Sequence, residues 1–272
     1  MQDFSSSPIE LGRSFWRNKG LIRNLAYREV AGRYKGSMLG IVWSLVTPLL
    51  MLSVYTFVFS VVFKARWNVQ STSHVEFGLV LFAGLLVFNL FSECIGRAPG
   101  LILANVNYVK KVIFPLEVLP WALLGSALFQ FAVSFAVWLL AYFALVGPPH
   151  WTVLLGPLVI APFALFVLGL SWALAALGVF LRDVSQLIGL VIQVLMFMTP
   201  IFYPASSLPP RLRTVMELNP LTPVISMMRD VMYWGRVPTI TEWLSTCALA
   251  VAVASLGFAW FQKTRKGFAD VI

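Results

Sequence analysis

The sequence is too apolar to be that of a soluble protein. Its 272 residues are 59% hydrophobic and 11% charged, with a mean hydropathy of +0.84, whereas soluble domains carry about 25% charged residues. We therefore predict a multi-pass membrane protein. The net charge of +9 is typical of basic loops retained on the cytoplasmic side of a membrane. Nucleic-acid binding is not expected, because no soluble domain carries a basic stripe.

Six segments are candidate membrane spans, because crossing a bilayer requires about 20 mostly apolar residues. They are residues 38–63, 77–95, 118–146, 153–181, 184–203 and 243–261. The first is longer than the hydrocarbon layer is thick, which predicts a tilt or a kink at Pro48. We expect an all-α polytopic membrane protein in which residues 1–272 form a single transmembrane domain.

The basic residues indicate the orientation of the chain. Six spans place both termini on the same side, and with both termini in the cytoplasm 14 of the 20 lysines and arginines fall in cytoplasmic segments, as the positive-inside rule requires. The spans contain almost no ionisable residues, although a proton or ion relay depends on them. This argues against an ion-coupled carrier, so the energy for any transport should come from elsewhere.

Residues 14–35 are predicted to form an amphipathic helix at the inner membrane surface. Apolar residues recur at helical spacing from Leu21 to Tyr34, with arginines between them. Such a helix is either a passive anchor or a collar that also meets a cytoplasmic partner. Glycines at a spacing of four, Gly36 and Gly40 among them, can mark helix packing, but at this charged edge a flexible turn is favoured.

Two connections between spans are longer than turns. Residues 99–116, on the cytoplasmic side, contain a short helical candidate and a lysine pair, and we favour a docking element for a soluble partner. Residues 204–240, on the outer side, contain short helical candidates at 212–218 and 223–234, the second with an apolar stripe of valines and methionines. These are too short to span, so a re-entrant hairpin or a flap over an exit is predicted.

No catalytic or metal-binding constellation is recognisable. The sequence lacks the G-x-x-x-x-G-K-[ST] loop of P-loop proteins, the H-E-x-x-H motif and the G-x-S-x-G elbow, and its two cysteines form no C-x-x-C pair. We expect no enzyme activity, no metal and no cofactor in this chain. The neighbouring opposite charges at Arg182-Asp183 and Arg229-Asp230 are interpreted as salt-bridged helix ends. An inward-facing subset of the aromatic residues can stack on sugar rings.

Several short motifs follow one another along nearly the whole chain. They are Arg33-Tyr34-Lys35-Gly36-Ser37 through Leu39-Gly40, Trp43 and Pro48; Lys110-Lys111 with Phe114-Pro115-Leu116-Glu117 and Pro120; Arg182-Asp183-Val184; Thr199-Pro200-Ile201; Tyr203-Pro204; and Asn219-Pro220. Each motif alone is weak, but the ordered set is specific and resembles the permease subunits of ABC-2 type polysaccharide exporters. A threonine at position 199 stands where we expect serine.

The resemblance implies a partner, a cargo and a location. Such permeases are homodimers that work with two copies of a separate ABC ATPase subunit, which binds ATP and Mg²⁺. They export undecaprenyl-type lipid-linked polysaccharide, such as O antigen, capsule or teichoic acid, across the cytoplasmic (inner) membrane. The resemblance also implies an N-terminal interfacial helix and short outer gate helices between spans five and six.

The resemblance also implies roles for particular residues. The lipid-diphosphate entrance would involve Arg33, Lys35, Leu39 and Gly40. Arg33 and Lys35 also suit this role chemically, because cations at the interface can pair with phosphate oxygens, although plain topology signals explain each of them equally well. The coupling loop to the ATPase would include Asn107, Tyr108, Lys110 and Lys111. For an aromatic-lined channel we assign Tyr55, Phe59, Phe197 and Phe202 from their positions along the spans.

Three other functions remain open. An ABC-2 exporter of a small drug or lipid would have the same spans and partner, and neighbouring glycosyltransferase genes would argue for polysaccharide instead. An integral membrane glycosyltransferase needs an active site, for which the outer region offers only Glu217, Asp230 and scattered arginines. A structural scaffold would show no ATP-dependent turnover in liposomes.

Overall fold

The computed structural model describes residues 7–62, 67, 74–109, 114–204, 209, 211, 216 and 218–272. Within these residues the chain is helical and contains no strand. The α-helices are α1 (Pro8–Tyr34), α2 (Trp43–Tyr55), α3 (His74–Arg97), α4 (Val106–Val109), α5 (Val118–Leu145), α6 (Gly156–Phe180), α7 (Val184–Met198), α9 (Leu221–Arg229), α10 (Ile240–Thr264) and α11 (Phe268–Val271). Short 3-10 and π-helical turns extend several of them, notably η1 (Gly40–Val42), η2 (Thr56–Val62), η4 (Trp151–Leu155) and η6 (Asp230–Trp234).

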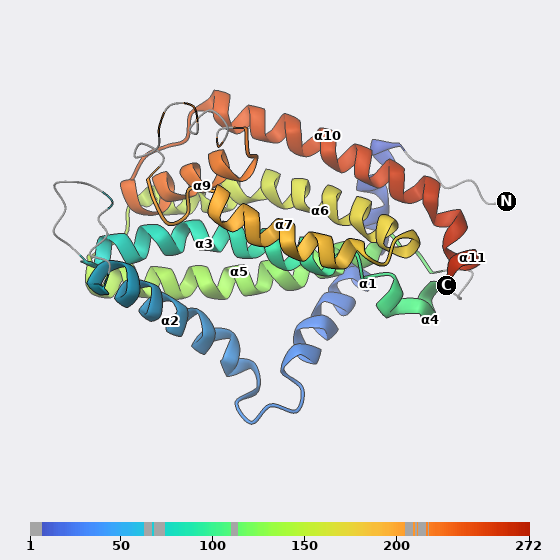
Figure 1. Cartoon of the computed structure of the whole chain (residues 1–272), viewed down its shortest axis with the longest axis horizontal. Coiled ribbons are helices and arrows are strands. Elements are labelled where there is room, and N and C mark those ends of the chain that lie inside the picture. The colour runs from blue at the N-terminus through green and yellow to red at the C-terminus, as the bar shows by residue number, and fades with distance from the viewer. Residues whose placement is uncertain are drawn as a thin grey trace.

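The long helices form one membrane-type bundle. Helices α3, α5, α6, α7 and α10 run along a common direction, and α2 is tilted away from them (Figure 1); a tilt was one of the two alternatives expected for the first predicted span. Five helical stretches of the described chain are long and apolar enough to cross a membrane: residues 40–59, 75–97, 118–145, 151–180 and 240–267. The predicted all-α polytopic class is thereby confirmed.

The fifth predicted span, residues 184–203, forms a shorter helix than predicted. Helix α7 has 15 residues and ends at Met198, which gives a length of about 22 Å at about 1.5 Å per residue, less than the roughly 30 Å of the hydrocarbon core. Thr199 is extended because it precedes a proline, which disfavours helical backbone at that position. The count of six spans therefore stays a prediction.

Glycines allow close packing between two helices of the bundle. A Cβ atom added at Gly257 in α10 would lie 2.0 Å from the carbonyl oxygen of Gly169 in α6, and one added at Gly169 would lie 2.6 Å from the backbone of Ala254. Small residues at such a seam let two membrane helices approach closely. Helix α3 lies in the interior, with nearly all side chains from Phe77 to Ile95 buried.

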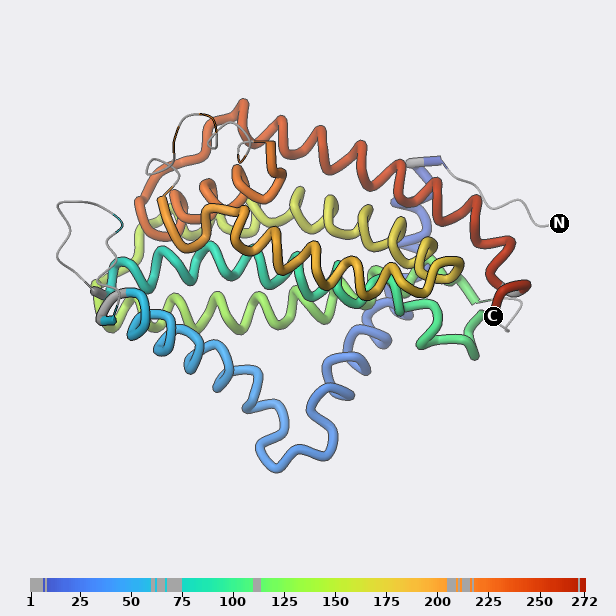
Figure 2. The backbone as a smooth tube through the Cα atoms, viewed as in Figure 1, coloured from blue at the N-terminus to red at the C-terminus, as the bar shows by residue number. Residues whose placement is uncertain are grey.

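The N-terminal helix and the first span form a V. Figure 2 shows α1 descending to a tip that stands away from the bundle and α2 returning to the opposite end. At the tip, Gly36 and Gly40 have φ angles of 87° and 52°, in the left-handed region that favours glycine, so the predicted turn is confirmed. Helix α1 begins earlier than predicted, at Pro8, where the Ser7 side chain caps the first turn.

The connection between α7 and α10, which the sequence predicts to lie on the outer side, enters the bundle. Helix α9 packs against α3 and α6, and the predicted apolar stripe is buried there. Its members are Val224, Met227, Met228, Val231 and Met232. The other predicted short helix, 212–218, falls mostly outside the described residues.

Candidate functional site

A cavity of about 410 Å³ lies between the V and the bundle helices α3 and α5. Its polar lining includes Arg33, Asn89, Glu93, Gln130 and Ser134, and its apolar lining includes Trp43, Pro48, Met51, Phe82 and Leu86. The cavity therefore offers charge near the end of α1 and apolar walls formed by α2 and α3. This combination suits an amphiphilic ligand.

Arg33 is the cation of this cavity, and a carboxylate already faces it. Its guanidinium donates hydrogen bonds to Glu93 and, at 3.1 Å, to the hydroxyl of Ser126. Burial on its own lowers the pKa of Arg33, but the hydrogen bond and negative charge of Glu93, together with the weaker effects of Tyr34 and Glu29, outweigh it, so the pKa is raised. Arg33 is thus a permanent positive charge held in place on α3 and α5.

A second cavity of about 520 Å³ has Arg33 and Glu93 in its lining as well. Its other lining residues are Arg28, Glu29, Gly32 and Arg97. Arg97 forms an ion pair with Glu29 and lies 3.8 Å from the carboxylate of Glu93. Three arginines thus face two glutamates, which leaves the cluster with an excess of positive charge for an anion.

Polar bonds also connect the arms of the V to the bundle. The Tyr34 hydroxyl donates to the side-chain carbonyl of Gln130 at 3.0 Å, and the Gln130 amide donates to the backbone carbonyl of Ser44 at 3.2 Å. One residue of α5 thereby joins the end of α1 to the start of α2. This chain of bonds fixes the width of the cavity.

The structure separates the predicted entrance residues. Arg33 lines both cavities, whereas Lys35, Leu39 and Gly40 lie in the turn at the tip and are not among the described lining residues. The side chains of Lys35 and Leu39 are exposed there. Sequence reasoning did not assign Glu93 or Gln130 to the site. Both are isolated polar residues in apolar segments, and such residues often mark functional sites in membrane proteins, so this pattern could have identified them.

The structure brings the four predicted channel aromatics together. Ring centroids are 6.4 Å apart for Tyr55 and Phe59, 5.3 Å for Phe59 and Phe202, and 6.0 Å for Phe197 and Phe202. Phe77 joins them at 5.9 Å from Phe59, a member that sequence reasoning missed. Their place in a channel stays a prediction.

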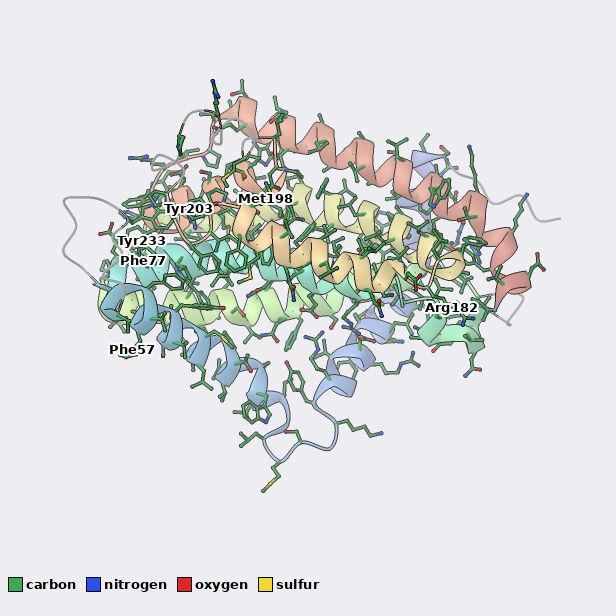
Figure 3. All side chains as sticks on the ribbon, viewed as in Figure 1. Phe57, Phe77, Arg182, Met198, Tyr203 and Tyr233 are labelled. Atoms are coloured by element: carbon green, nitrogen blue, oxygen red, sulfur yellow. The ribbon has the colours of Figure 1, made fainter. Side chains whose placement is uncertain are left out.

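This aromatic cluster lies at one end of the bundle. Figure 3 shows Phe77, Tyr203 and Tyr233 together near that end, whereas Arg182 lies near the other end, by α11. Tyr203 donates a hydrogen bond to the backbone carbonyl of Phe197 at 2.8 Å. The segment that follows α7 is therefore held against α7 itself.

The predicted coupling loop is partly described. The rings of Tyr108 in α4 and Phe114 stack with centroids 4.2 Å apart, and the Arg28 guanidinium lies 5.7 Å from the centre of the Tyr108 ring. Asn107 is exposed. Lys110 and Lys111 lie outside the described residues. The loop thus contacts the helix that carries Arg33.

A buried carboxylate anchors the end of this loop, and sequence reasoning gave it no role. Glu117 accepts a hydrogen bond from the Ser14 hydroxyl at 3.1 Å and pairs with Arg265 at 2.6 Å. Arg265 also donates to the backbone carbonyl of Phe114 at 2.7 Å. Helix α1, the loop and the chain after α10 therefore meet at one residue.

The interpretation of Arg229 as part of a salt-bridged helix end needs correction. Its side chain is buried, with a residue exposure of 6%, and its guanidinium donates to three backbone carbonyls, those of Val80, Pro200 and Ile201.

Within the part of the chain that the structure describes, no group of three or more His, Cys, Asp or Glu residues could hold a metal ion.

Comparisons with known proteins agree with this architecture. The profile of the ABC-2 type transporter family matches residues 20–233. The chain is 30% identical to the O-antigen export system permease protein RfbA of Myxococcus xanthus, over 97% of this chain and 100% of the relative. It is 27% identical to a protein of the same name from Klebsiella pneumoniae, over 90% and 92% of the two chains.

A more distant relative is the polysialic acid transport protein KpsM of Escherichia coli, 23% identical over 80% of this chain and 83% of the relative. The family profile covers well over half of the chain, and the Myxococcus relative is matched along its full length. The chain belongs to the ABC-2 type transporter family.

Proposed function

We propose that this chain is the permease subunit of an ABC exporter that moves lipid-linked polysaccharide out across the cytoplasmic membrane. The observation that carries the proposal is the match to an O-antigen export permease over that protein's whole length. The relative named for polysialic acid transport also handles a long glycan. In this proposal the permease is a homodimer, and two copies of a separate ATPase bind ATP and Mg²⁺ and supply the energy.

The cavity beside Arg33 receives the lipid diphosphate in this proposal. A diphosphate carries negative oxygens that arginine can bind through two parallel hydrogen bonds, and the cluster around Arg33 has an excess of positive charge. The apolar wall formed by Pro48, Met51 and Phe82 suits the isoprenoid chain. A volume of about 410 Å³ is that of a small-ligand pocket, so it accommodates the headgroup and not the glycan.

Glu93 competes with the diphosphate for Arg33. The two side chains are hydrogen-bonded in this structure, so an arriving headgroup has to displace the carboxylate before it can take both donors of the guanidinium. Arg97, 3.8 Å from Glu93, offers the displaced carboxylate another cation. Exchange of one anion for another keeps Arg33 paired throughout, which avoids the cost of an unpaired charge near the membrane.

The glycan then follows a path past the aromatic cluster of Tyr55, Phe59, Phe197 and Phe202. Aromatic faces hold sugar rings through their C–H bonds, weakly enough for a polymer to slide. Motion of the ATPase subunits reaches the permease through the loop at residues 99–116. Contact of Tyr108 with Arg28 connects this loop to the helix that carries Arg33.

Export assays on variants at Arg33 and Glu93 test the headgroup site. Arg33→Ala removes charge-assisted hydrogen bonds of about 1.5–3 kcal/mol, so surface glycan should fall by about ten-fold or more, and Arg33→Lys should restore part of it. Glu93→Gln removes the competing charge and should tighten binding of a lipid diphosphate. Arg17→Ala, at an exposed ion pair on the same helix, is the matched control and should export normally. Normal export by Arg33→Ala would refute the site.

A substitution of Lys35 distinguishes a headgroup site in the cavity from a headgroup site in the turn at the tip of the V. Its exposed position at the tip predicts that Lys35→Ala exports within about two-fold of the wild type, as expected for a surface charge. An effect as large as that of Arg33→Ala would move the headgroup site from the cavity to the turn.

Export of a small lipid is the alternative that shares this cavity. A lipid diphosphate without glycan should then be moved as efficiently as the glycan-bearing form. Transport in proteoliposomes that contain the permease and its ATPase distinguishes the two. Our proposal predicts that the glycan-bearing lipid is moved to the lumen more efficiently than the lipid diphosphate without glycan.

A further inference from the structure

Arg229 occupies an unusual position for an arginine of a membrane protein. It ends α9, is buried, and donates through Nε to the carbonyl of Val80 at 3.1 Å and through its two terminal nitrogens to those of Pro200 and Ile201 at 2.7 and 2.8 Å. The Trp67 ring lies over its guanidinium at 4.3 Å. One side chain therefore joins α9 to the segment after α7 and to α3.

The surrounding backbone is shaped for this guanidinium. A Cβ atom added at Gly84 of α3 would lie 2.7 Å from a terminal nitrogen of Arg229 and 3.3 Å from the side chain of Ile225. Glycine at this position lets the guanidinium lie against the helix. Only arginine has a planar fork of N–H donors that can reach carbonyls in different directions, whereas the ammonium of lysine is a single point.

The other end of α9 is attached to the same segment. The Asn219 amide donates to the Thr199 hydroxyl at 2.9 Å, and its side-chain carbonyl accepts from the backbone N–H of Leu221 at 3.0 Å, in the first turn of α9. Residues 199–201 are thus bound by Asn219 at the start of α9 and by Arg229 at its end. The carbonyls of Pro200 and Ile201 belong to the chain that follows the last residue of α7, Met198, and are not part of that helix.

We propose that Arg229 is a positioning residue that holds α9 against the end of α7 and so keeps the outer end of the export path closed at rest. Phe202, next to the clamped segment, belongs to the aromatic cluster assigned to that path. Widening the path for a glycan then requires the guanidinium to release the carbonyls of Pro200 and Ile201. The inference rests on the proposed export path, but resting closure can be measured without glycan or ATP.

The test is passive leakage from liposomes that contain the permease and its ATPase without nucleotide, loaded with carboxyfluorescein. Loss of charge-assisted hydrogen bonds should raise the population of the open outer end, and with it dye release, by about ten-fold or more in Arg229→Met. Gly84→Ala should leak as well, because the new methyl group displaces an intact arginine. Gly96→Ala is the matched control on the same helix, since among the described residues its Cβ would meet Ile192 alone, at 3.4 Å.

Combining the variants tests the contact itself. Adding Gly84→Ala to Arg229→Met should not increase leakage further, because the guanidinium that the new methyl group would displace is already absent. Arg229→Lys should leak less than Arg229→Met. If the Gly84→Ala and Arg229→Lys proteins fold correctly and their liposomes release no more dye than those of the wild type, the proposal is overturned. This test remains available if Arg229→Met fails to fold. Leakage by Arg229→Met together with a tight Gly84→Ala would overturn it too. Either result with normal wild-type export would leave the proposed function intact.

Discussion

Replacing Glu117 with alanine tests whether one buried carboxylate holds together the end of the bundle where α1, the predicted coupling loop and the chain after α10 meet. Its side chain is 6% exposed and pairs with Arg265, whose side chain is 10% exposed, at 2.6 Å. It also accepts the hydrogen bond of the Ser14 hydroxyl. The substitution leaves the Trp172 hydrogen bond to the backbone carbonyl of residue 117 at 3.1 Å, so the effect should come from the carboxylate alone.

The expected effect is large because the pair is buried. Removing one partner of a buried ion pair costs about 3–5 kcal/mol, since the other charge stays in a poorly solvated place. For a chain of this size about 1 kcal/mol corresponds to about 2–4 °C, so the melting temperature should fall by about 6–20 °C. Tryptophan fluorescence of the purified protein in detergent during heating is a suitable assay, because the chain has 10 tryptophans.

Glu10→Ala is the matched control for this measurement. Glu10 pairs with Arg17 at 3.0 Å, with side-chain exposures of 21% and 61%, and such surface pairs contribute about 0–1 kcal/mol. In a double-mutant cycle the costs of Glu117→Ala and Arg265→Ala should not add. Equal melting temperatures for Glu117→Ala and Glu10→Ala would refute the anchoring role.

Two further predictions concern glycines. Gly36→Ala places a side chain at a φ of 87° and should cost about 1–2 kcal/mol of folding free energy. Gly12→Ala in α1, where an added Cβ meets none of the described residues within 4 Å, should be neutral or stabilising. The melting temperatures of the two variants in detergent test this difference. Gly257→Ala puts a Cβ 2.0 Å from the Gly169 carbonyl and should cost about 1–3 kcal/mol or more by forcing α6 and α10 apart. Gly189→Ala, where an added Cβ would have no neighbour within 4 Å among the described residues, is its control, and equal yields and melting temperatures would contradict the tight seam.

Five of the six predicted spans overlap helical stretches that are long and apolar enough to cross a membrane, because a crossing requires a long apolar run that can be read from the sequence. Residues 118–146 were predicted for a helix found at 118–145, within the usual uncertainty of helix ends. Helix α1 was predicted too short, although Ser7, Pro8 and Glu10 form a recognisable helix start. Helix α7 was predicted too long, because the apolar run continues past the proline that ends it.

The polar contacts of the site could be predicted only in part. Arg33 was assigned to the predicted entrance by the family resemblance and because cations at a membrane edge can pair with phosphate oxygens, but its pairing with Glu93 joins positions 60 residues apart. Arg229 donates to a carbonyl 149 residues away, and a backbone acceptor leaves no mark in a sequence. Neither contact produces a recognisable pattern in the nearby sequence, so both become visible only when the packing of α1, α3 and α9 is known.

The central claim is that this chain is a conduit whose driving force comes from a separate nucleotide-hydrolysing subunit. The most direct measurement is translocation of a lipid-linked glycan into the lumen of proteoliposomes. We predict accumulation only when the permease, its ATPase partner and ATP are all present. Accumulation by the permease alone, driven by a proton or sodium gradient, would contradict the account.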